Sequence, residues 1–214
     1  MKHGFPFPKP ARDALKDHVR SALAKIEHQR FFNEPSYTAA LANRLEGVVY
    51  DENGCYIEIK STDVDHQGSG AAEKWSGADM AITAIISNSE HRIEKAILIQ
   101  AKRGNIAELP SKQKKELNKQ IKKMKQYTHS PKVMQIVDED TRRRVGILSG
   151  NKILFNESCK TFDLEDYFVR RILTTLDGDT HKDFVEAVQE HSLCRLQIIG
   201  KTPLVSKKTR KKTE

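Results

Sequence analysis

The chain has few cysteines and no long hydrophobic run, and both absences narrow the classes of protein to which it can belong. Its three cysteines, Cys55, Cys159 and Cys194, lie far apart and form no Cys-x-x-Cys pair. The sequence therefore indicates neither a disulfide framework nor a structural zinc site. No apolar run approaches the roughly 20 residues of a membrane helix, and the opening segment has no signal-peptide apolar core. We expect a cytoplasmic protein that makes no contact with a membrane.

Sequence patterns of known nucleic-acid readers are also lacking. The 8 histidines are scattered without metal-ligand spacing, and no helix-turn-helix or zinc-finger pattern is present. No internal repeat is visible. Recognition of a base sequence in the grooves of DNA is therefore not predicted.

Positive charge, by contrast, is abundant. The 37 Lys and Arg residues outnumber the 29 Asp and Glu residues, which gives a net charge of +8 and an isoelectric point of about 9.3. Such a balance favours a polyanionic partner such as nucleic acid. The 214 residues suffice for one domain of moderate size with a buried core.

Hydrophobic periodicity predicts both helices and strands. Leu15, Val19 and Leu23 recur at helical spacing, whereas Ile57 and Ile59 alternate with polar residues as in a strand. The expected helices cover residues 11–30, 36–46, 111–127, 164–176 and 180–191. The expected strands cover residues 55–60, 78–86, 95–101, 133–137 and 144–148, with a hairpin connection at 87–94 and a tight turn at 149–151 leading into 152–155. This order predicts an α/β fold with a mixed central sheet flanked by helices.

Two short apolar segments carry polar residues that a buried strand does not normally hold. They are Gly77-Ala78-Asp79-Met80-Ala81-Ile82 and Ile97-Leu98-Ile99-Gln100-Ala101-Lys102-Arg103. Burying Asp, Gln or Lys costs free energy unless the group is paired, so the presence of these residues in buried strands indicates a specific role. Because side chains alternate along a strand, Gln100 and Lys102 are expected to project together, beside Asp79 if the two strands are neighbours.

This combination suggests a site that hydrolyses phosphodiester bonds with the help of a hard cation. Mg²⁺ prefers oxygen ligands, here the Asp79 carboxylate, the Gln100 side-chain carbonyl and the Ala101 main-chain carbonyl, and Mn²⁺ is expected to substitute. Lys102 is then expected to orient the attacking water or to stabilise negative charge on the phosphate. Because Gln100 is neutral where a carboxylate would add charge, we expect weak Mg²⁺ binding before the substrate arrives.

The arrangement Asp79…Gln100-x-Lys102, with an acidic helix ahead of it, resembles the PD-(D/E)xK nuclease superfamily, which has the restriction-endonuclease-like fold. The sequence pattern Gly-Ala-Asp…Gln-Ala-Lys-Arg is most similar to that of Mrr-type restriction enzymes and archaeal Holliday-junction resolvases, where Gln can replace the second acid. The family also places a helix glutamate in the site and at the metal. Glu34 is the preferred candidate for this residue, and Glu46 is the alternative.

The resemblance also implies a division of the chain. Residues 31–160 are expected to form the nuclease core, with a helical extension over residues 1–30 and a C-terminal helical part over residues 161–200 packed on the core. Residues 201–214 are mostly Lys, Arg, Thr and Ser and are expected to form a disordered basic tail.

Basic segments supply the expected contacts to DNA. The candidate phosphate-binding residues are Lys112, Lys115, Lys119, Lys122, Lys123, Arg142 and Arg143. Such contacts bind the backbone without choosing a sequence. We therefore expect a Mg²⁺-dependent endodeoxyribonuclease with little sequence specificity, gated by a protein partner or by assembly and acting in defence against foreign DNA or in DNA repair. The family resemblance implies a homodimer. The alternative is an inactive nucleic-acid-binding protein or an interaction subunit of a larger complex.

Overall fold

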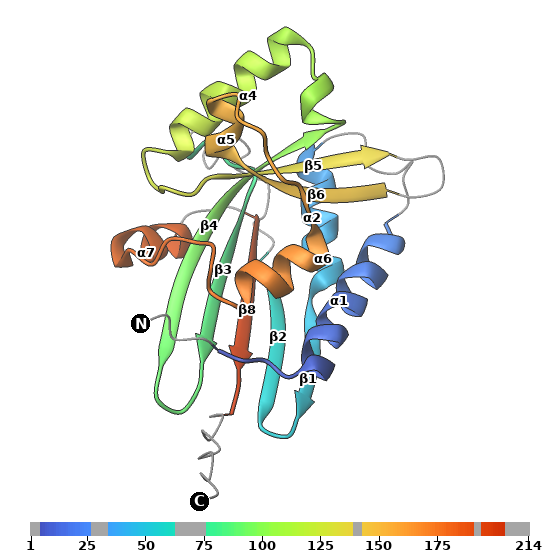
Figure 1. Cartoon of the computed structure of the whole chain (residues 1–214), viewed down its shortest axis with the longest axis vertical. Coiled ribbons are helices and arrows are strands. Elements are labelled where there is room, and N and C mark those ends of the chain that lie inside the picture. Colours follow the sequence, from blue (N-terminus) through green and yellow to red (C-terminus); the bar gives the residue numbers. More distant parts are fainter. Residues whose placement is uncertain (1–4, 27–33, 63–75, 139–142, 191–193, 204–214) are drawn as a thin grey trace, which may run out of the picture.

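The centre of the molecule is an eight-stranded mixed β-sheet with the strand order β1-β2-β8-β3-β4-β5-β6-β7. The computed structural model describes residues 5–26, 34–62, 76–138, 143–190 and 194–203. Figure 1 shows β2, β3, β4 and β8 running side by side and β5 and β6 crossing the upper end of the molecule, as expected for a strongly twisted sheet.

The elements follow one another as alternating groups of helices and strands. The strands are β1 (Gly47–Glu52), β2 (Cys55–Thr62), β3 (Met80–Ser87), β4 (Arg92–Arg103), β5 (Lys132–Asp138), β6 (Arg143–Ser149), β7 (Phe162–Asp163) and β8 (Cys194–Lys201). The helices are α1 (Lys9–Ala24), α2 (Glu34–Leu45), α4 (Ser111–Met124), α5 (Gly150–Leu154), α6 (Leu164–Tyr167) and α7 (Lys182–Glu190), with a 3-10 turn η1 (Ile106–Glu108) and a π-helical turn η2 (Phe168–Ile172).

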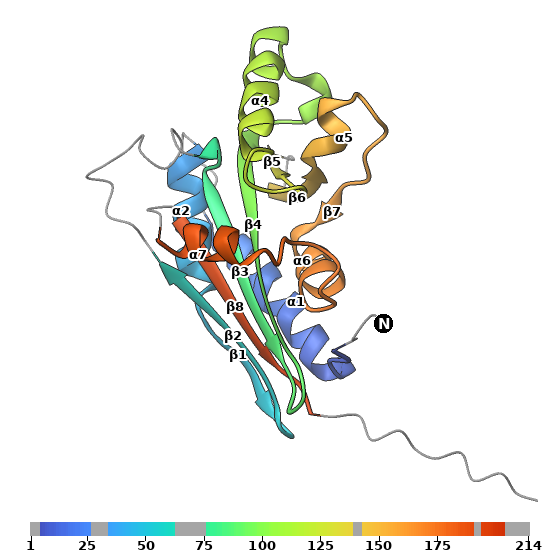
Figure 2. The ribbon, with the colours of Figure 1, turned by 90° about the vertical axis from the view of Figure 1, so that its left-hand side faces the viewer.

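The two faces of the sheet have separate hydrophobic cores. Along β4, Ile97 and Ile99 belong to the larger core, which also contains residues of α1, α2, α6 and η2. Leu98, between them, belongs to the smaller core beneath α4 and α7. This follows from the alternation of side chains along a strand. Figure 2 accordingly shows α1 and α6 on one side of the strands and α7 on the other.

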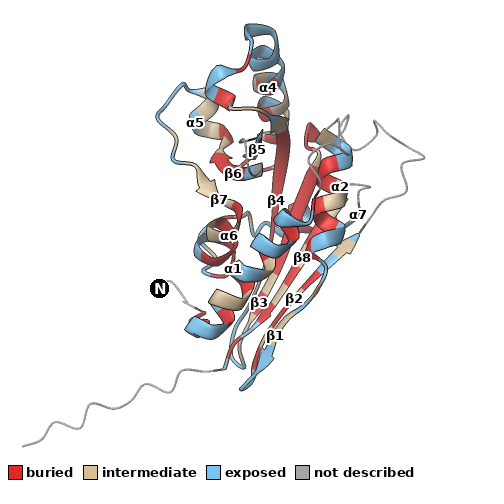
Figure 3. Cartoon of the chain, turned by 90° about the vertical axis from the view of Figure 1, so that its right-hand side faces the viewer, coloured by how far each residue is buried: buried red, intermediate tan, exposed pale blue. Residues whose placement is uncertain are grey.

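The helices cover the sheet with their apolar faces. Leu15 and Val19 of α1 are fully buried, and Leu117, Ile121 and Met124 form the buried stripe of α4. Figure 3 shows that burial is concentrated along β3, β4 and β8, while the outer surface of α4 is exposed. The helical and alternating patterns of the sequence therefore correspond to observed buried faces.

The structure confirms the α/β class, the mixed sheet with flanking helices and the hairpin between β3 and β4, which pair antiparallel. The tight turn predicted at residues 149–151 is wrong, because Gly150 begins the short helix α5. The strands β1, β7 and β8 were not predicted. In particular, residues 161–200 are not only helical, since they include β8, which lies between β2 and β3 inside the sheet. The expected disordered tail at residues 201–214 is wrong at its start, because Lys201 ends β8 and Thr202 is buried and donates to the Pro6 carbonyl over 3.2 Å. Residues 204–214 lie outside the described residues.

Among the described helices, none has both the length and the apolar character needed to cross a membrane.

Candidate functional site

Asp79, the residue directly before β3, lies opposite Gln100 on the neighbouring strand β4. The antiparallel register pairs Met80 with Ile99, and the Asp79 main-chain N–H donates to the Ile99 carbonyl over 3.0 Å. Asp79 is two residues before Ala81, and Gln100 is two residues after Leu98, so both side chains lie on the face covered by α4 and α7. The predicted approach of these two side chains is therefore present in the structure.

Three groups converge at this point of the sheet. The Gln100 side-chain N–H₂ donates to Asp79 Oδ2 in a short hydrogen bond and to the Ala101 carbonyl oxygen over 3.0 Å. The Ala101 main-chain N–H donates to the same Asp79 oxygen over 2.8 Å. Gln100 is buried, whereas Asp79 is partly exposed. The Asp79 carboxylate is thus held rigidly by hydrogen bonds from β4.

The segment before Asp79 is shaped by a glycine that packs against α4. Gly77 has a φ of +71°, and a Cβ atom there would lie 2.9 Å from the main-chain oxygen of Gln120 and 3.2 Å from Lys123 Cβ. Both the backbone conformation and the close approach require glycine. Ser76 Oγ accepts a hydrogen bond from the Ala78 N–H over 3.2 Å. The Gly-Ala-Asp sequence therefore fixes Asp79 directly beside α4.

Lys102 is paired with the first candidate for the helix acid. Its ammonium group lies 3.2 Å from Glu34 Oε2, and the Arg103 main-chain N–H donates to Glu34 Oε1 over 3.1 Å. The Lys102 side chain is 13% exposed and that of Glu34 is 29% exposed, so the pair can be reached from solvent. The N-terminal end of α2 thus meets the end of β4 at Lys102 and Arg103, two and three residues after Gln100.

The alternative acid, Glu46, lies elsewhere. It accepts a hydrogen bond from Ser61 Oγ over 2.6 Å, beyond the other end of α2 and beside β2. Of the two glutamates, Glu34 is the one that the structure places at Lys102.

The oxygen donors around Asp79 decide whether the site fits a hard cation. No group of three or more His, Cys, Asp or Glu side chains in the described residues could hold a metal ion. At Asp79, however, the other oxygen donors come from an amide and a main-chain carbonyl. Gln100 Oε1 is buried without a hydrogen-bond partner among the described residues, while its nitrogen faces both oxygens. Rotating the amide by half a turn would exchange these atoms and present three oxygens to a cation, so the residues fit Mg²⁺.

The basic residues of α4 lie near this site. Lys112, Lys115, Lys119 and Lys122 are exposed, and Lys123 is partly exposed next to Gly77. They face away from the buried stripe of Leu117, Ile121 and Met124. Arg142 lies outside the described residues, and so does the side chain of Arg143, whose backbone begins β6.

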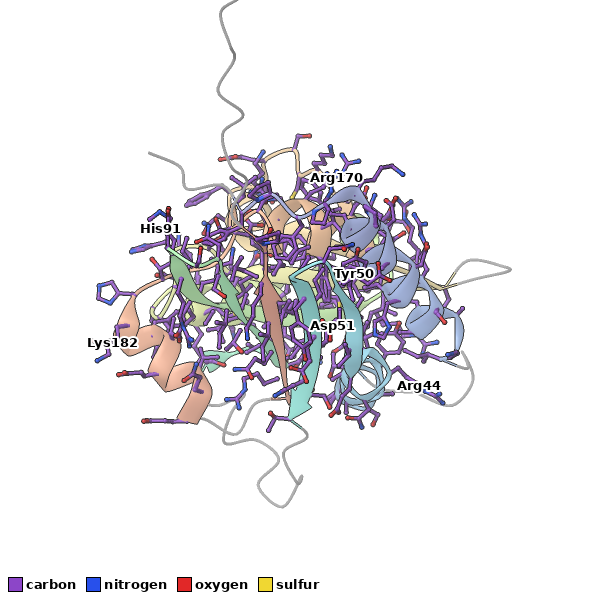
Figure 4. All side chains as sticks on the ribbon, turned by 90° about the horizontal axis from the view of Figure 1, so that it is seen from below. Arg44, Tyr50, Asp51, His91, Arg170 and Lys182 are labelled. Atoms are coloured by element: carbon purple, nitrogen blue, oxygen red, sulfur yellow. The ribbon has the colours of Figure 1, made fainter. Side chains whose placement is uncertain are left out.

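The sequence did not predict a second charged cluster, which is buried on the opposite face of the sheet. Asp177 accepts from Arg171 over 2.7 Å and lies 3.0 Å from the Lys132 ammonium, while Lys95 donates to the Asp177 main-chain carbonyl. The signal was available, because Lys95 and Lys132 both border apolar strand segments. Figure 4 shows Arg170, beside this cluster on η2, and Lys182 of α7 on opposite sides of the strands.

Burial dominates the electrostatics of this second cluster. It lowers the pKa of Lys95 to about 8, and the nearby Asp177 carboxylate offsets only part of that effect. Burial also acts to raise the pKa of Asp177, but hydrogen bonds from Arg171 and Lys132 together bring that pKa below its ordinary value. The cluster joins β4 and β5 to the segment after η2, and its enclosed position is that of a structural network.

Comparisons of the chain with protein-family models, with curated proteins and with solved structures gave no significant match.

Proposed function

We propose that this protein is a metal-dependent endonuclease with a restriction-endonuclease-like fold that hydrolyses phosphodiester bonds in DNA. The observation that carries the proposal is the convergence of the Asp79 carboxylate, the Gln100 amide and the Ala101 carbonyl on one face of the sheet. Lys102 follows on the same strand as Gln100, and α4, the helix with the exposed lysines, packs on that strand. Two further supports are the order of these residues along neighbouring strands and the basic charge of the chain.

In this proposal each residue has a distinct part. Asp79, Gln100 and the Ala101 carbonyl hold Mg²⁺, with Mn²⁺ as a substitute, and the bound cation supplies Lewis-acid activation of water and phosphate. Lys102 places a positive charge where the scissile phosphate gains negative charge. Glu34 fixes the Lys102 ammonium through Oε2 and is proposed as a further oxygen donor to the cation.

The proposed substrate is DNA held mainly by its backbone. The exposed lysines of α4 contact phosphates, which gives affinity without sequence choice. Such an enzyme would damage its own cell unless it were controlled, so the proposal includes gating by a protein partner or by homodimerisation. Defence against foreign DNA or DNA repair, within the cytoplasm, is the proposed setting.

A second candidate function is favoured by the state of Gln100. Its N–H₂ group already satisfies Asp79 and Ala101, and Lys102 is already paired with Glu34. A site closed by internal contacts in this way also fits a catalytically inactive protein that binds nucleic acid or serves as a subunit of a larger complex.

Cleavage of linear and supercoiled DNA in the presence of Mg²⁺ or Mn²⁺ separates the two functions. Asp79→Ala and Lys102→Ala should each lower the rate by about 100-fold or more, because the first removes the proposed metal carboxylate and the second removes the positive charge proposed to act at the reacting phosphate. Asp51→Ala and Lys160→Ala, which change exposed residues outside the site, should cut like the wild type. RNA is tested alongside DNA. DNA binding without cutting would support the inactive protein, and equal cutting by all variants would place the activity elsewhere.

A further inference from the structure

A pocket of about 340 Å³ lies between the C-terminal end of α4 and the start of α7, apart from Asp79 and Gln100. Its lining includes Tyr127, His129, Asp179, His181, Asp183 and Phe184. The volume falls in the range of small-molecule sites, and the pocket is open to solvent on one side. The lining combines the aromatic rings of Tyr and Phe with two imidazoles and two carboxylates, and it contains no lysine or arginine although the protein is basic.

The pocket lies directly beyond the C-terminal end of α4, the helix that carries the exposed lysines. Gln126, which also lines the pocket, is two residues after the last helical residue Met124, and its main-chain N–H donates to the Lys123 carbonyl over 3.1 Å. The other wall is α7, which packs on β3 and β4 on the same side of the sheet as α4. A nucleic-acid backbone bound to the α4 lysines would therefore pass the mouth of the pocket.

The lining is suited to a flat ring with amino groups rather than to a phosphate. Tyr127, Phe184 and the exposed rings of His129 and His181 offer surfaces on which a base can stack. The carboxylates repel an anion and accept hydrogen bonds from N–H groups.

The two carboxylates differ in their availability. Asp179 is occupied, because it accepts from the main-chain N–H of His181 over 3.0 Å and from the Thr128 hydroxyl over 3.4 Å. Asp183 is exposed and makes no hydrogen bond or ion pair within the described part of the chain. It is therefore the acceptor that a ligand can use.

We propose that this pocket binds an unpaired nucleobase, with guanine preferred, turned out of the strand whose phosphates lie on α4. A carboxylate can accept from both the ring N–H and the exocyclic N–H₂ of guanine, whereas thymine offers a single ring N–H. The source of the base rests on the proposed function, since it assumes that α4 binds nucleic acid. The pocket chemistry itself does not depend on the metal site.

The test uses nucleosides, because they carry no phosphate and do not engage the α4 lysines. NMR titration of the full chain with 2′-deoxyguanosine should shift signals of His129, His181 and Tyr127 in a saturable way, with thymidine binding at least about fivefold more weakly. Asp183→Asn should weaken binding of 2′-deoxyguanosine about fivefold to tenfold, because a charge-assisted hydrogen bond is lost. Glu190→Gln removes an exposed acid from the same helix and should bind like the wild type.

A variant that fills the pocket tests the same binding without changing Asp183. Ala187→Trp places an indole into the pocket wall and should abolish nucleoside binding, whereas Gln189→Trp, on the opposite side of α7, should not. Asp79→Ala should bind 2′-deoxyguanosine normally even though the proposed function predicts that it cannot cut DNA. No saturable binding, equal binding of thymidine, or binding retained by Ala187→Trp would each overturn the inference. Binding of the nucleoside without any DNA cleavage would leave the pocket in place and reject the nuclease.

Discussion

At the scale of single residues, Gln100 can act either as a structural crosslink or as a metal ligand, and one substitution distinguishes these two roles. Its amide nitrogen donates hydrogen bonds to two oxygen atoms, those of Asp79 and Ala101, in a buried position. A cation in the same place could bind the same two oxygen atoms, provided that the amide is turned so that its own oxygen also faces the cation. The residue is therefore either a structural crosslink or a metal ligand in its metal-free orientation.

Gln100→Glu should make the fold depend on a divalent cation. Without metal, the variant loses two hydrogen bonds and places a second carboxylate against Asp79, so we expect it to be about 2 kcal/mol less stable than the wild type. Mg²⁺ should restore most of that loss, because two carboxylates and a main-chain carbonyl are a stronger oxygen donor set. Urea unfolding with and without millimolar Mg²⁺ measures both effects.

The matched control for this substitution is Gln189→Glu, which adds the same charge on the exposed surface of α7. Its stability should not respond to Mg²⁺. A Gln100→Glu protein that is destabilised but equally insensitive to Mg²⁺ would show that the three oxygens do not form a cation site.

Lys95 predicts a pH dependence of stability at the other face of the sheet. Its pKa is lowered to about 8 in the folded protein from 10.5, mainly by burial, so the folded state releases this proton before the unfolded chain does. Stability therefore rises with pH above 8, and the gain between pH 8 and pH 10 is about 2 kcal/mol. Asp177, Arg171 and Lys132 face the same ammonium group.

Denaturant unfolding of the wild type and Lys95→Met at pH 8, 9 and 10 isolates this contribution. The wild type should gain about 2 kcal/mol relative to the variant over that range. The range stops at pH 10 because Tyr167 has the opposite effect on stability at higher pH. Burial raises the pKa of Tyr167 in the folded protein, so above pH 10 the unfolded chain loses this proton first and the folded state becomes less stable. Lys25→Met, at an exposed position, should follow the wild type. Parallel curves for the wild type and Lys95→Met would contradict the prediction.

At the scale of elements, α4 combines a structural face with a charged one. Leu117, Ile121 and Met124 anchor it to the sheet, so the lysines on its outer side can be changed without touching the core. Replacing Lys112, Lys115, Lys119 and Lys122 by Gln should weaken DNA binding and reduce the slope of log K against log salt concentration by about 3 to 4.

The control for the α4 variant carries the same change in net charge. Lys9, Lys25, Lys160 and Lys201 are also exposed but lie outside α4. Changing these four to Gln should leave the salt slope nearly unaltered, and binding measured by fluorescence anisotropy at several salt concentrations compares the two variants. Equal effects of both sets would mean that net charge, not α4, governs binding.

Helices and strands with a clear hydrophobic periodicity could be predicted from the sequence. Elements whose structure depends on packing against segments distant in the sequence could not. The apolar stripe of α4 is visible in the sequence, as is the alternation of Ile57 and Ile59 in β2. The run Ile153-Leu154-Phe155, by contrast, is too short to distinguish helix from extended chain. It is helical at Ile153 and Leu154 because α5 packs on α4, where Gly150 lies close to Ile121 and the Pro131 carbonyl.

The same distinction holds for the candidate site. Asp79, Gln100 and Lys102 could be placed together because two neighbouring strands and a period of two suffice. The contact of Glu34 with Lys102 joins residues 68 positions apart, and it depends on how α2 meets the end of β4. The orientation of the Gln100 amide is set by its hydrogen bonds, which no local pattern contains.

At the scale of the whole molecule, the two parts of the sheet are connected by β8, the last strand of the described chain. β8 pairs in parallel with β3 from Met80 to Ser87 and antiparallel with β2 from Tyr56 to Thr62. Leu196 and Ile198 add to the larger core. In the sheet, β8 therefore joins β3 and β4, beside which Asp79 and Gln100 lie, to β1 and β2.

A chain ending at Glu190 should consequently fail to fold, whereas a chain ending at Pro203 should keep the stability of the full protein. Removing β8 leaves the facing edges of β2 and β3 without main-chain partners and opens the larger core around Ile59 and Ile82. Circular dichroism during urea unfolding should show one cooperative transition for the chain of residues 1–203, at the midpoint of the full chain, and none for residues 1–190. A cooperative transition in the shorter chain would mean that the β3–β4 site folds independently of β8, and the sheet would then consist of two separable parts.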